Sequence, residues 1–441
     1  TQHYNMNTFL RYIAVIGVCL IAFAFTTTTS YPIDGYATTG IKRLLQLERI
    51  QKDSTKEFRR IRKGALLPLN CIKLNLTGKQ NSTLNELLVE DPEFSKKLKA
   101  ILPSTRGYSV TVMDMTNPDN LKYAGYNERA GYQPGSVGKI MVANALFSQL
   151  KKICPESWDA RTEILKNKVI RAGDWALYDH HTVPIYDVED DKLIKRTVRA
   201  DDTFTLYEWV DHMMSVSNNG AASVVWREAV LMEAFGYDYV SLTEEQANAY
   251  WKDTDRRELT QLSNDVVNKP IRFLGITEDE WRLGSFFTSG ANKHVGDIGG
   301  SIGTPLGLMK YLVQLEQGKV IDPESSLEIK RLLYMTDRRI RYAYSPTLND
   351  AAVFFKSGSL YSCDRSNGQS CAKYAGNVYN YMNSVAIVEH PDGKKYLVCL
   401  MTNVLRKNSA YDHQALAGRI DNLVTERNAP VEVLEETKDE S

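Results

Sequence analysis

Strand-like patterns near both ends of the chain, separated by a long stretch that is mostly helical in pattern, constrain the fold most strongly. β-Branched and aromatic residues bounded by turn residues predict strands at residues 108–115, 121–126, 352–360, 384–390 and 395–401. Residues from about 155 to 345 have mainly helical periodicity. Strands from two chain ends can pair around an inserted segment. We therefore predict an α+β fold: an antiparallel sheet formed by both chain ends, with helices packed on it and an inserted all-helical subdomain.

The charge balance of the chain limits its possible partners. Its 441 residues include 54 Lys and Arg and 54 Asp and Glu, which leave a formal net charge of zero. Nucleic-acid-binding domains are usually strongly basic, so the composition argues against a nucleic-acid partner. The run Asp179-His180-His181 and the acidic residues after it follow no standard zinc spacing. We expect a solvated acidic loop there, and we predict neither a metal nor a cofactor.

The patterns divide the chain into residues 1–30, 31–83, 84–428 and 429–441, with the helical subdomain at about residues 150–345. The first part contains the apolar run Tyr12–Phe25, which is short for a bilayer crossing and suits a signal peptide; an N-terminal membrane anchor is the alternative. Both alternatives predict export, with the main domain periplasmic or anchored outside the cytoplasm. The second part is expected to be a linker and an amphipathic helix over residues 41–62 with a solvated basic face. The last part is a polar acidic tail.

Two cysteines bracket a polar stretch that we expect to be a loop between strands. Cys363 and Cys371 are separated by Asp-Arg-Ser-Asn-Gly-Gln-Ser. Disulfides persist in oxidising compartments, and export would place this pair in one. We predict a disulfide between Cys363 and Cys371, with two free thiols as the alternative.

A serine and a lysine three residues apart are the first candidate catalytic pair. In Pro134-Gly-Ser-Val-Gly-Lys139 a turn runs into a predicted helix from Ser136 through Leu150. Residues three apart on a helix face the same way, so the Ser136 hydroxyl and the Lys139 amine can meet. A serine becomes a strong nucleophile when a neighbouring base takes its proton, and a lysine with a lowered pKa can be that base. The same pattern also arises by chance, with the serine as a helix N-cap.

Two further motifs follow in a specific order. Ser217-Asn-Asn219 lies in the helical stretch, and Lys356-Ser-Gly-Ser359 ends a predicted strand. The set of Ser-x-x-Lys, Ser-x-Asn and Lys-Ser/Thr-Gly resembles the motif set of the class A β-lactamases and penicillin-binding proteins, and the resemblance spans roughly residues 108–424. It implies a β-lactamase/transpeptidase-like fold for the main domain.

The resemblance implies a role for each motif residue. Ser136 would attack a carbonyl carbon, while Lys139 and Ser217 would relay its proton to the leaving nitrogen. The backbone N–H groups of Ser136 and Ser359 would form the oxyanion hole.

Substrate binding would fall to the second and third motifs. The Asn219 amide would hold the acyl side chain of the substrate. Lys356 and Ser357 would face its carboxylate. Gly358 would keep the strand edge open, so that the substrate backbone can pair beside it.

One part of the class A pattern is missing. Those enzymes use a glutamate in a Glu-x-x-Leu-Asn pattern on the Ω loop to activate the water that clears the acyl-enzyme. Counting back from Gly296, the position falls near Phe287 or Thr288, where no carboxylate stands. Asn292 could match the asparagine of the pattern. A carboxylate among residues 278–280 could reach the site if the loop is rearranged.

The sequence therefore predicts an exported class A β-lactamase-like serine hydrolase that forms an acyl-enzyme on Ser136 with a β-lactam or an acyl-D-amino-acid substrate. A cell-wall D,D-peptidase or transpeptidase is one alternative, because it needs no glutamate at that place. A weakly catalytic penicillin-binding sensor or binding domain that stays acylated is another. The expected partner is a small-molecule or peptidoglycan-derived substrate, with membrane association through the N-terminal segment as an open alternative.

Overall fold

The computed structural model describes residues 34–429 except 53–63, 65–66, 367 and 369. The predicted signal or anchor segment, and all but the first residue of the predicted acidic tail, lie outside the described residues. Within the part of the chain that is described, no helix is both long enough and apolar enough to cross a membrane.

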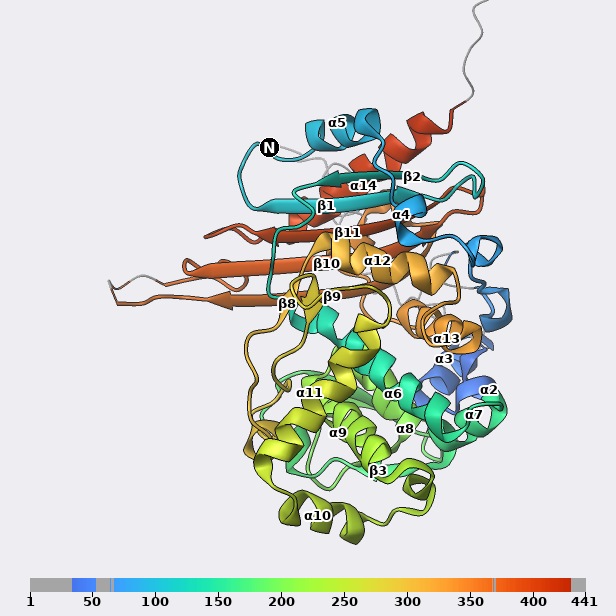
Figure 1. The fold of residues 1–441 in the computed structure, drawn as a ribbon, viewed down its shortest axis with the longest axis vertical. Coiled ribbons are helices and arrows are strands. Elements are labelled where there is room, and N and C mark those ends of the chain that lie inside the picture. Colours follow the sequence, from blue (N-terminus) through green and yellow to red (C-terminus); the bar gives the residue numbers. More distant parts are fainter. Residues whose placement is uncertain (1–33, 53–63, 65–66, 367, 369, 430–441) are drawn as a thin grey trace, which may run out of the picture.

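A five-stranded antiparallel sheet joins the two ends of the chain, which confirms the predicted α+β architecture (Figure 1). Its strands, in spatial order, are β2 (Lys122–Tyr126), β1 (Tyr108–Asp114), β11 (Lys395–Asn403), β10 (Tyr379–Glu389) and β9 (Ala352–Ser362). The central pairing sets Val112 of β1 opposite Val398 of β11. An early hairpin and three late strands thus form one surface.

Alternate residues of the central strands enter two different cores. In β11, Leu397 and Cys399 belong to the core shared with the helical subdomain, while Val398 and Leu400 belong to the core on the opposite face. A strand buried on both faces needs apolar residues at successive positions, because neighbouring side chains point to opposite sides. This explains why residues 395–401 form a nearly continuous apolar run.

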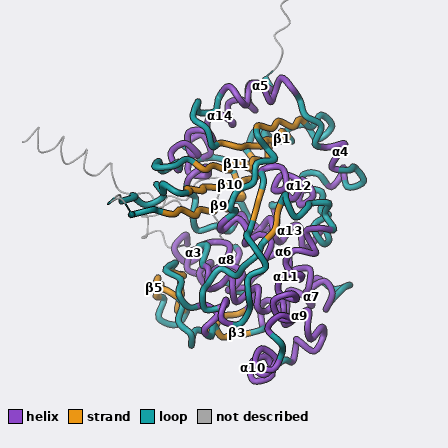
Figure 2. Tube along the Cα trace, turned by 60° about the vertical axis from the view of Figure 1, so that its left-hand side comes forward, coloured by secondary structure: helices purple, strands orange, loops and turns teal. Residues whose placement is uncertain are grey.

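Helices cover both faces of the sheet (Figure 2). The terminal helices α5 (Pro92–Ala100) and α14 (Ala410–Arg427) pack on one face, with the short α4 (Leu84–Leu87) preceding α5. On the other face, α12 (Pro305–Glu316) contacts β1 and β11, and α13 (Pro323–Tyr334) contacts β9. Although α12 and α13 fall within the predicted helical subdomain, they pack on the sheet.

The inserted subdomain is built around helix α6 (Lys139–Ile153), which contacts α9 and α11. Its other helices are α7 (Trp158–Asn167), α8 (Leu206–Ser215), α9 (Asn219–Phe235), α10 (Glu244–Asp253) and α11 (Arg256–Arg272). Most of the α6 side chains are buried, including Lys139 in its first turn. A central helix buried nearly all round brings the candidate lysine into the interior.

The subdomain also contains short strands that the helical pattern did not predict. They form the pairs β3 (Val169–Arg171) with β6 (Thr203–Thr205), β4 (Thr182–Asp187) with β5 (Lys192–Thr197), and β7 (Trp281–Arg282) with β8 (Ile302–Gly303). Strand β5 is polar and mostly exposed, so it lacks the apolar alternation by which a strand is found in a sequence. In the turn before it, the Asp187 carboxylate accepts hydrogen bonds from the backbone N–H groups of Glu189 and Asp190.

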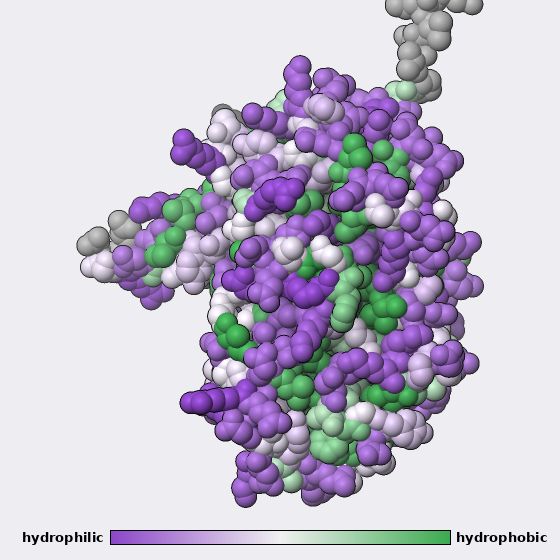
Figure 3. Space-filling model, in the orientation of Figure 1, coloured by the Kyte–Doolittle hydropathy of each residue, from purple (hydrophilic) through white to green (hydrophobic). Residues whose placement is uncertain are grey.

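The end of the β9–β10 hairpin projects from the body of the molecule (Figure 3). The surface in this view is mostly hydrophilic, with apolar residues in small groups. Leu360, Tyr361 and Val378 of this hairpin are exposed. A disulfide between Cys363 and Cys371, with Cα atoms 5.9 Å apart, closes the loop between the two strands.

The N-terminal extension packs against the subdomain. Helices α2 (Gly35–Thr39) and α3 (Lys42–Lys52) precede residues outside the described part, and Leu44 and Leu47 of α3 lie in the main core. Arg43 is buried: its Nε and Nη2 donate to the Asp211 carboxylate at 2.5 and 2.6 Å. The expected solvated basic face is therefore wrong for Arg43, whose charge is paired with an acidic residue far along the chain.

We predict that Arg43→Ala lowers the free energy of unfolding by about 3 kcal/mol or more, because it leaves the buried Asp211 carboxylate without its partner. Urea unfolding followed by circular dichroism measures this change. Lys42→Ala is the matched control, since the Lys42 side chain is 51% exposed and its ion pair with Glu208 is 4.0 Å long. Equal losses from both substitutions would contradict the prediction.

Candidate active site

The candidate nucleophile lies in a tight turn at the start of α6. Residues Gly135–Gly138 form one 3₁₀ turn, and the α-helix begins at Lys139 rather than at Ser136 as predicted. Gly135 has a positive φ of 53°, which a glycine adopts without steric cost. The turn brings Lys139 Nζ to 3.1 Å from Ser136 Oγ. The two residues therefore meet, as their spacing predicts.

Strand β9 lies directly against this turn. A Cβ atom on Gly358 would lie 2.2 Å from the Pro134 carbonyl oxygen and 2.8 Å from the Ser136 nitrogen. A Cβ atom on Gly135 would lie 3.0 Å from the Ser359 nitrogen. A side chain at position 358 would therefore push strand β9 away from the nucleophile. This requirement for glycine was not predicted from the sequence. The backbone nitrogens proposed for the oxyanion hole belong to these two facing segments.

Lys139 Nζ is surrounded by oxygen atoms. It lies 2.6 Å from the Ser217 carbonyl oxygen, 2.7 Å from Asn219 Oδ1 and 3.3 Å from Ser217 Oγ, besides its contact with Ser136. The two carbonyl-type oxygens only accept hydrogen bonds, so each takes one N–H of the amine. In a neutral amine, which has two N–H groups and one lone pair, these two oxygens would use both N–H groups and leave the lone pair for the serine hydroxyl. Asn219 thus holds the lysine, a contact that the sequence analysis did not predict.

Burial makes the neutral amine accessible near physiological pH. The Lys139 side chain is fully buried. Burial lowers the pKa of its amine to about 7, the nearby Arg338 guanidinium acts in the same direction, and Asp179 opposes both. The Phe287 ring centroid lies 5.2 Å from Nζ. One neighbour of the amine is therefore an apolar ring.

Ser217 lies between two buried lysines. Its hydroxyl accepts a hydrogen bond from Lys356 Nζ at 2.8 Å and lies 3.3 Å from Lys139 Nζ. Burial and the nearby cations, Lys139 first among them, hold the pKa of Lys356 well below its ordinary value. Ser217 has a positive φ of 62°, an uncommon conformation for a residue other than glycine. The hydroxyl is positioned to pass a proton between the first and third motifs.

A pocket opens beside Ser136, and basic side chains from two segments of the chain line it. Lys356 comes from β9, while Arg338 and Arg341 come from the loop that precedes this strand. Arg341 donates to the Gly358 carbonyl oxygen at 2.8 Å and to Ser359 Oγ at 3.0 Å. None of the described residues that line this pocket is acidic. The site therefore favours an anionic ligand.

The two arginines were not predicted from the sequence. They follow no recognised spacing and lie in a polar loop, where exposed charge is the ordinary expectation. Tyr374, which follows the disulfide-closed loop, also lines the pocket and was not predicted. Its ring centroid lies 5.3 Å from the Arg341 guanidinium carbon. The sequence feature that could have indicated the arginines is the basic run Arg338-Arg-Ile-Arg341, which precedes strand β9.

Among the described residues that line the pocket, no carboxylate takes the place of the missing Ω-loop glutamate. At the counted position, Phe287 faces Lys139, and Thr288 is buried, donating to the Trp175 carbonyl oxygen at 2.6 Å. Of the upstream carboxylates, Glu280 pairs with Lys310 at 2.6 Å, and none of residues 278–280 lines the pocket. The alternative in which these carboxylates reach the site is therefore wrong.

The segment Asp179–His181 is not the solvated loop that the sequence predicts. The Asp179 side chain is 2% exposed. Its carboxylate accepts from the Asn219 backbone N–H at 2.7 Å and lies 2.6 Å from His181 Nδ1. His181 lines the pocket of Ser136. The three residues bring possible metal-ligand atoms within 4.8 Å of one another, but the carboxylate already binds the start of α9 and the imidazole.

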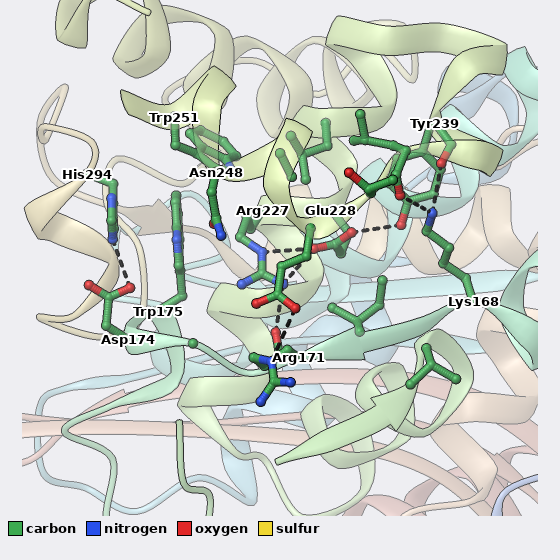
Figure 4. A pocket seen from close by; sticks show the side chains of 18 of the residues that line it. Lys168, Arg171, Asp174, Trp175, Arg227, Glu228, Tyr239, Asn248, Trp251 and His294 are labelled. Atoms are coloured by element: carbon green, nitrogen blue, oxygen red, sulfur yellow. Dashed lines mark hydrogen bonds and ion pairs between the residues drawn. The ribbon is translucent and has the colours of Figure 1, made fainter. Parts of the chain in front are cut away.

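A separate cavity of about 390 Å³ lies within the helical subdomain, away from Ser136 (Figure 4). Its charged groups mainly bind protein atoms. Lys168 Nζ donates to three backbone carbonyl oxygens, and Arg227 pairs with Glu228 at 2.7 Å. Trp175 stacks on His294 with ring centroids 4.5 Å apart. This cavity matters for the site because Trp175 begins the segment that carries Asp179 and His181.

Comparisons with known proteins agree with the motif set. A sequence model described as the β-lactamase enzyme family matches residues 93–427. No curated protein sequence matches the chain. Similar solved structures include a β-lactamase from Sphaerobacter thermophilus (17% identity, TM-score 0.47, covering 76% of this chain and 97% of that one). Another is a β-lactamase from Chitinophaga pinensis (16% identity, TM-score 0.49, covering 76% of this chain and 100% of that one).

We predict that the Lys139 amine titrates near pH 7, because it is fully buried and forms no ion pair with a carboxylate of the described residues. The ¹³Cε shifts of labelled lysines measure this pKa, and the signal is assigned by its loss in Lys139→Arg. Phe287→Glu should raise the pKa by placing a carboxylate beside the amine, while Phe287→Leu, the uncharged control, should leave it low. A Lys139 signal that titrates at the ordinary lysine value would show that the amine is not activated.

Proposed function

The chain belongs to the β-lactamase enzyme family, and we propose that it is an exported class A-like serine hydrolase that forms an acyl-enzyme on Ser136. The proposed substrate is a β-lactam or an acyl-D-amino-acid compound. The observation that carries this proposal is the buried Lys139 amine, which lies 2.6 Å from the Ser217 carbonyl oxygen, 2.7 Å from Asn219 Oδ1 and 3.1 Å from Ser136 Oγ.

Acylation would begin with proton transfer. Neutral Lys139 takes the hydroxyl proton as Ser136 Oγ attacks the carbonyl carbon of the substrate. The negative charge that develops on the carbonyl oxygen is bound by the backbone N–H groups of Ser136 and Ser359. Removing one such donor typically costs about 3 to 4 kcal/mol of barrier stabilisation.

The leaving nitrogen must receive a proton before its bond to the acyl carbon breaks. Ser217 Oγ is the proposed donor, because it lies between Lys139 and Lys356 and can be resupplied with a proton from either side. The bond between the carbonyl carbon and nitrogen then breaks. The product is an ester on Ser136.

The charge of the pocket supports an anionic substrate. Lys356, Arg338 and Arg341 line it, and no acidic residue does so among the described residues. β-Lactams and peptides that end in a D-amino acid both carry a carboxylate near the bond to be cleaved. A carboxylate bound to a guanidinium or ammonium gains charge-assisted hydrogen bonds.

Phe287 favours a second candidate function. Because this apolar ring lies where class A enzymes have their glutamate, a D,D-peptidase or transpeptidase, or a sensor that stays acylated, is the alternative. Export is proposed from the N-terminal apolar run. The Cys363–Cys371 disulfide fits the same proposal, since disulfides persist mainly outside the cytoplasm.

A fluorescent penicillin should label the wild-type chain, and Ser136→Ala should abolish the labelling. Lys139→Ala should slow labelling about 10²-fold or more, because general bases typically contribute at least that factor. The wild-type rate should rise about tenfold per pH unit below about 7 and level off above it, because only the neutral amine accepts a proton. Labelling that persists unchanged in Ser136→Ala would refute the proposal. Subsequent rapid loss of label favours a lactamase, and lasting label favours a peptidase or sensor.

The pocket cations should select a free carboxylate. We expect wild-type chain to acylate faster with a penicillin than with its methyl ester, by about 10-fold or more, from the loss of a hydrogen bond to a charged group. Arg338→Ala should reduce this preference. The acylation rate, measured at several concentrations of each compound, gives this preference. If Arg338→Ala keeps the wild-type preference for the free carboxylate over the methyl ester, Arg338 does not bind the carboxylate.

A further inference from the structure

An acyl-enzyme that turns over needs a base to activate the hydrolytic water. This inference rests on the proposed function and concerns its second step. The site has an apolar ring, Phe287, at the counted glutamate position, and the described residues that line the pocket include no carboxylate. Lys139 serves as the base of the first step. A separate base for the second step would be another side chain that faces the pocket.

His181 is the candidate for such a base. It lines the same pocket as Ser136. Its Nδ1 lies 2.6 Å from Asp179 Oδ1. Because a carboxylate can only accept, Nδ1 carries the proton, and Nε2 is left with a lone pair. A carboxylate that orients an imidazole in this way also stabilises the imidazolium that forms when the ring takes a proton.

Further hydrogen bonds fix the position of the imidazole. The His181 backbone N–H donates to Asp179 Oδ1 at 3.2 Å, and Asn218 Nδ2 donates to the His181 carbonyl oxygen at 2.9 Å. Asp179 Oδ2 accepts from the Asn219 backbone N–H at 2.7 Å. The Ser217–Asn219 motif therefore holds both the lysine amine and the histidine segment.

The same segment is anchored where it begins. Trp175 stacks on His294 in the wall of the subdomain cavity (Figure 4), and its carbonyl oxygen accepts from Thr288 at 2.6 Å. A Cβ atom on Gly220 would lie 2.5 Å from the Ala176 carbonyl oxygen, so the segment packs directly on the start of α9. Catalytic groups work best when such surrounding contacts hold them in place.

We propose that His181, oriented by Asp179, is the general base that activates water for hydrolysis of the acyl ester on Ser136. Nε2 takes one proton from the water as the water oxygen attacks the ester carbonyl carbon. The bond between that carbon and Ser136 Oγ then breaks, and the imidazolium returns the proton to Oγ. The products are the free serine, the neutral imidazole and a carboxylic acid.

The surrounding charges are consistent with a neutral imidazole. Burial lowers the pKa of His181 below its ordinary value, Asp179 opposes this shift, and the Lys139 and His180 side chains add to it. On the other walls of the pocket, the charged side chains are Lys356, Arg338 and Arg341. Burial opposes ionisation of Asp179, but its hydrogen bonds to His181 and to Asn219 outweigh burial and lower the pKa of this carboxyl to about 2.

The test separates the two chemical steps in the full-length chain. A fluorescent penicillin gives the acylation rate, and a chase with unlabelled penicillin gives the rate of label loss. In His181→Ala, acylation should stay within a few-fold of wild type while label loss slows about 10²-fold or more. The matched control is His180→Ala, which removes the exposed neighbouring imidazole that stacks on His181 and should change neither rate by more than a few-fold.

Chemical rescue distinguishes a base from a structural contact. Added imidazole should restore label loss in His181→Ala in proportion to its concentration, and should not accelerate wild type. In wild type, label loss should slow as the pH falls through the lowered pKa of His181, because the protonated ring cannot accept a proton.

Three outcomes would overturn the inference. If His181→Ala acylates normally and loses label at the wild-type rate, His181 is not the base, and the proposed function stands. Wild-type chain that keeps its label throughout the chase also overturns the inference, because no base then acts. If no labelling depends on Ser136, the proposed function fails and this inference fails with it.

Discussion

The burial of the Lys139 amine is the constraint on which the rest of the site depends. An ammonium group buried without a counter-ion in contact is unstable relative to the neutral amine, and the neutral amine is the form that can take a proton from Ser136. Two acceptor oxygens, from Ser217 and Asn219, fix where the remaining lone pair points. The Phe287 ring, 5.2 Å from Nζ, is part of the enclosure.

Holding this amine requires the whole domain. Helix α6 supplies the lysine, and the oxygens come from Ser217 before α9 and from Asn219 at its start. Strand β9 must approach the nucleophile closely enough that Gly358 can carry no side chain. Because the sheet combines strands from both ends of the chain, the site forms only when the complete domain has folded. The inserted subdomain adds the Asp179–His181 pair, which we propose acts in the second step.

Local patterns were sufficient to predict the sheet, the meeting of Ser136 with Lys139 and the family of the chain. Strand alternation and a spacing of three residues on a helix are properties of short segments, which a sequence displays directly. Arg338, Arg341 and His181 could not be found in this way. Their place in the pocket depends on how loops pack on distant elements, and a charged residue in a polar stretch looks solvated. Arg43 was misjudged for the same reason, since its partner Asp211 lies in another helix.

The central claim is that Ser136 is acylated. Peptide mapping by mass spectrometry after incubation with benzylpenicillin tests it most directly, because the mass of the adduct and its position are read together. The account predicts a penicilloyl adduct on the peptide that contains Ser136. An adduct on any other residue, or its absence from this peptide under conditions where the chain is folded, would contradict the account.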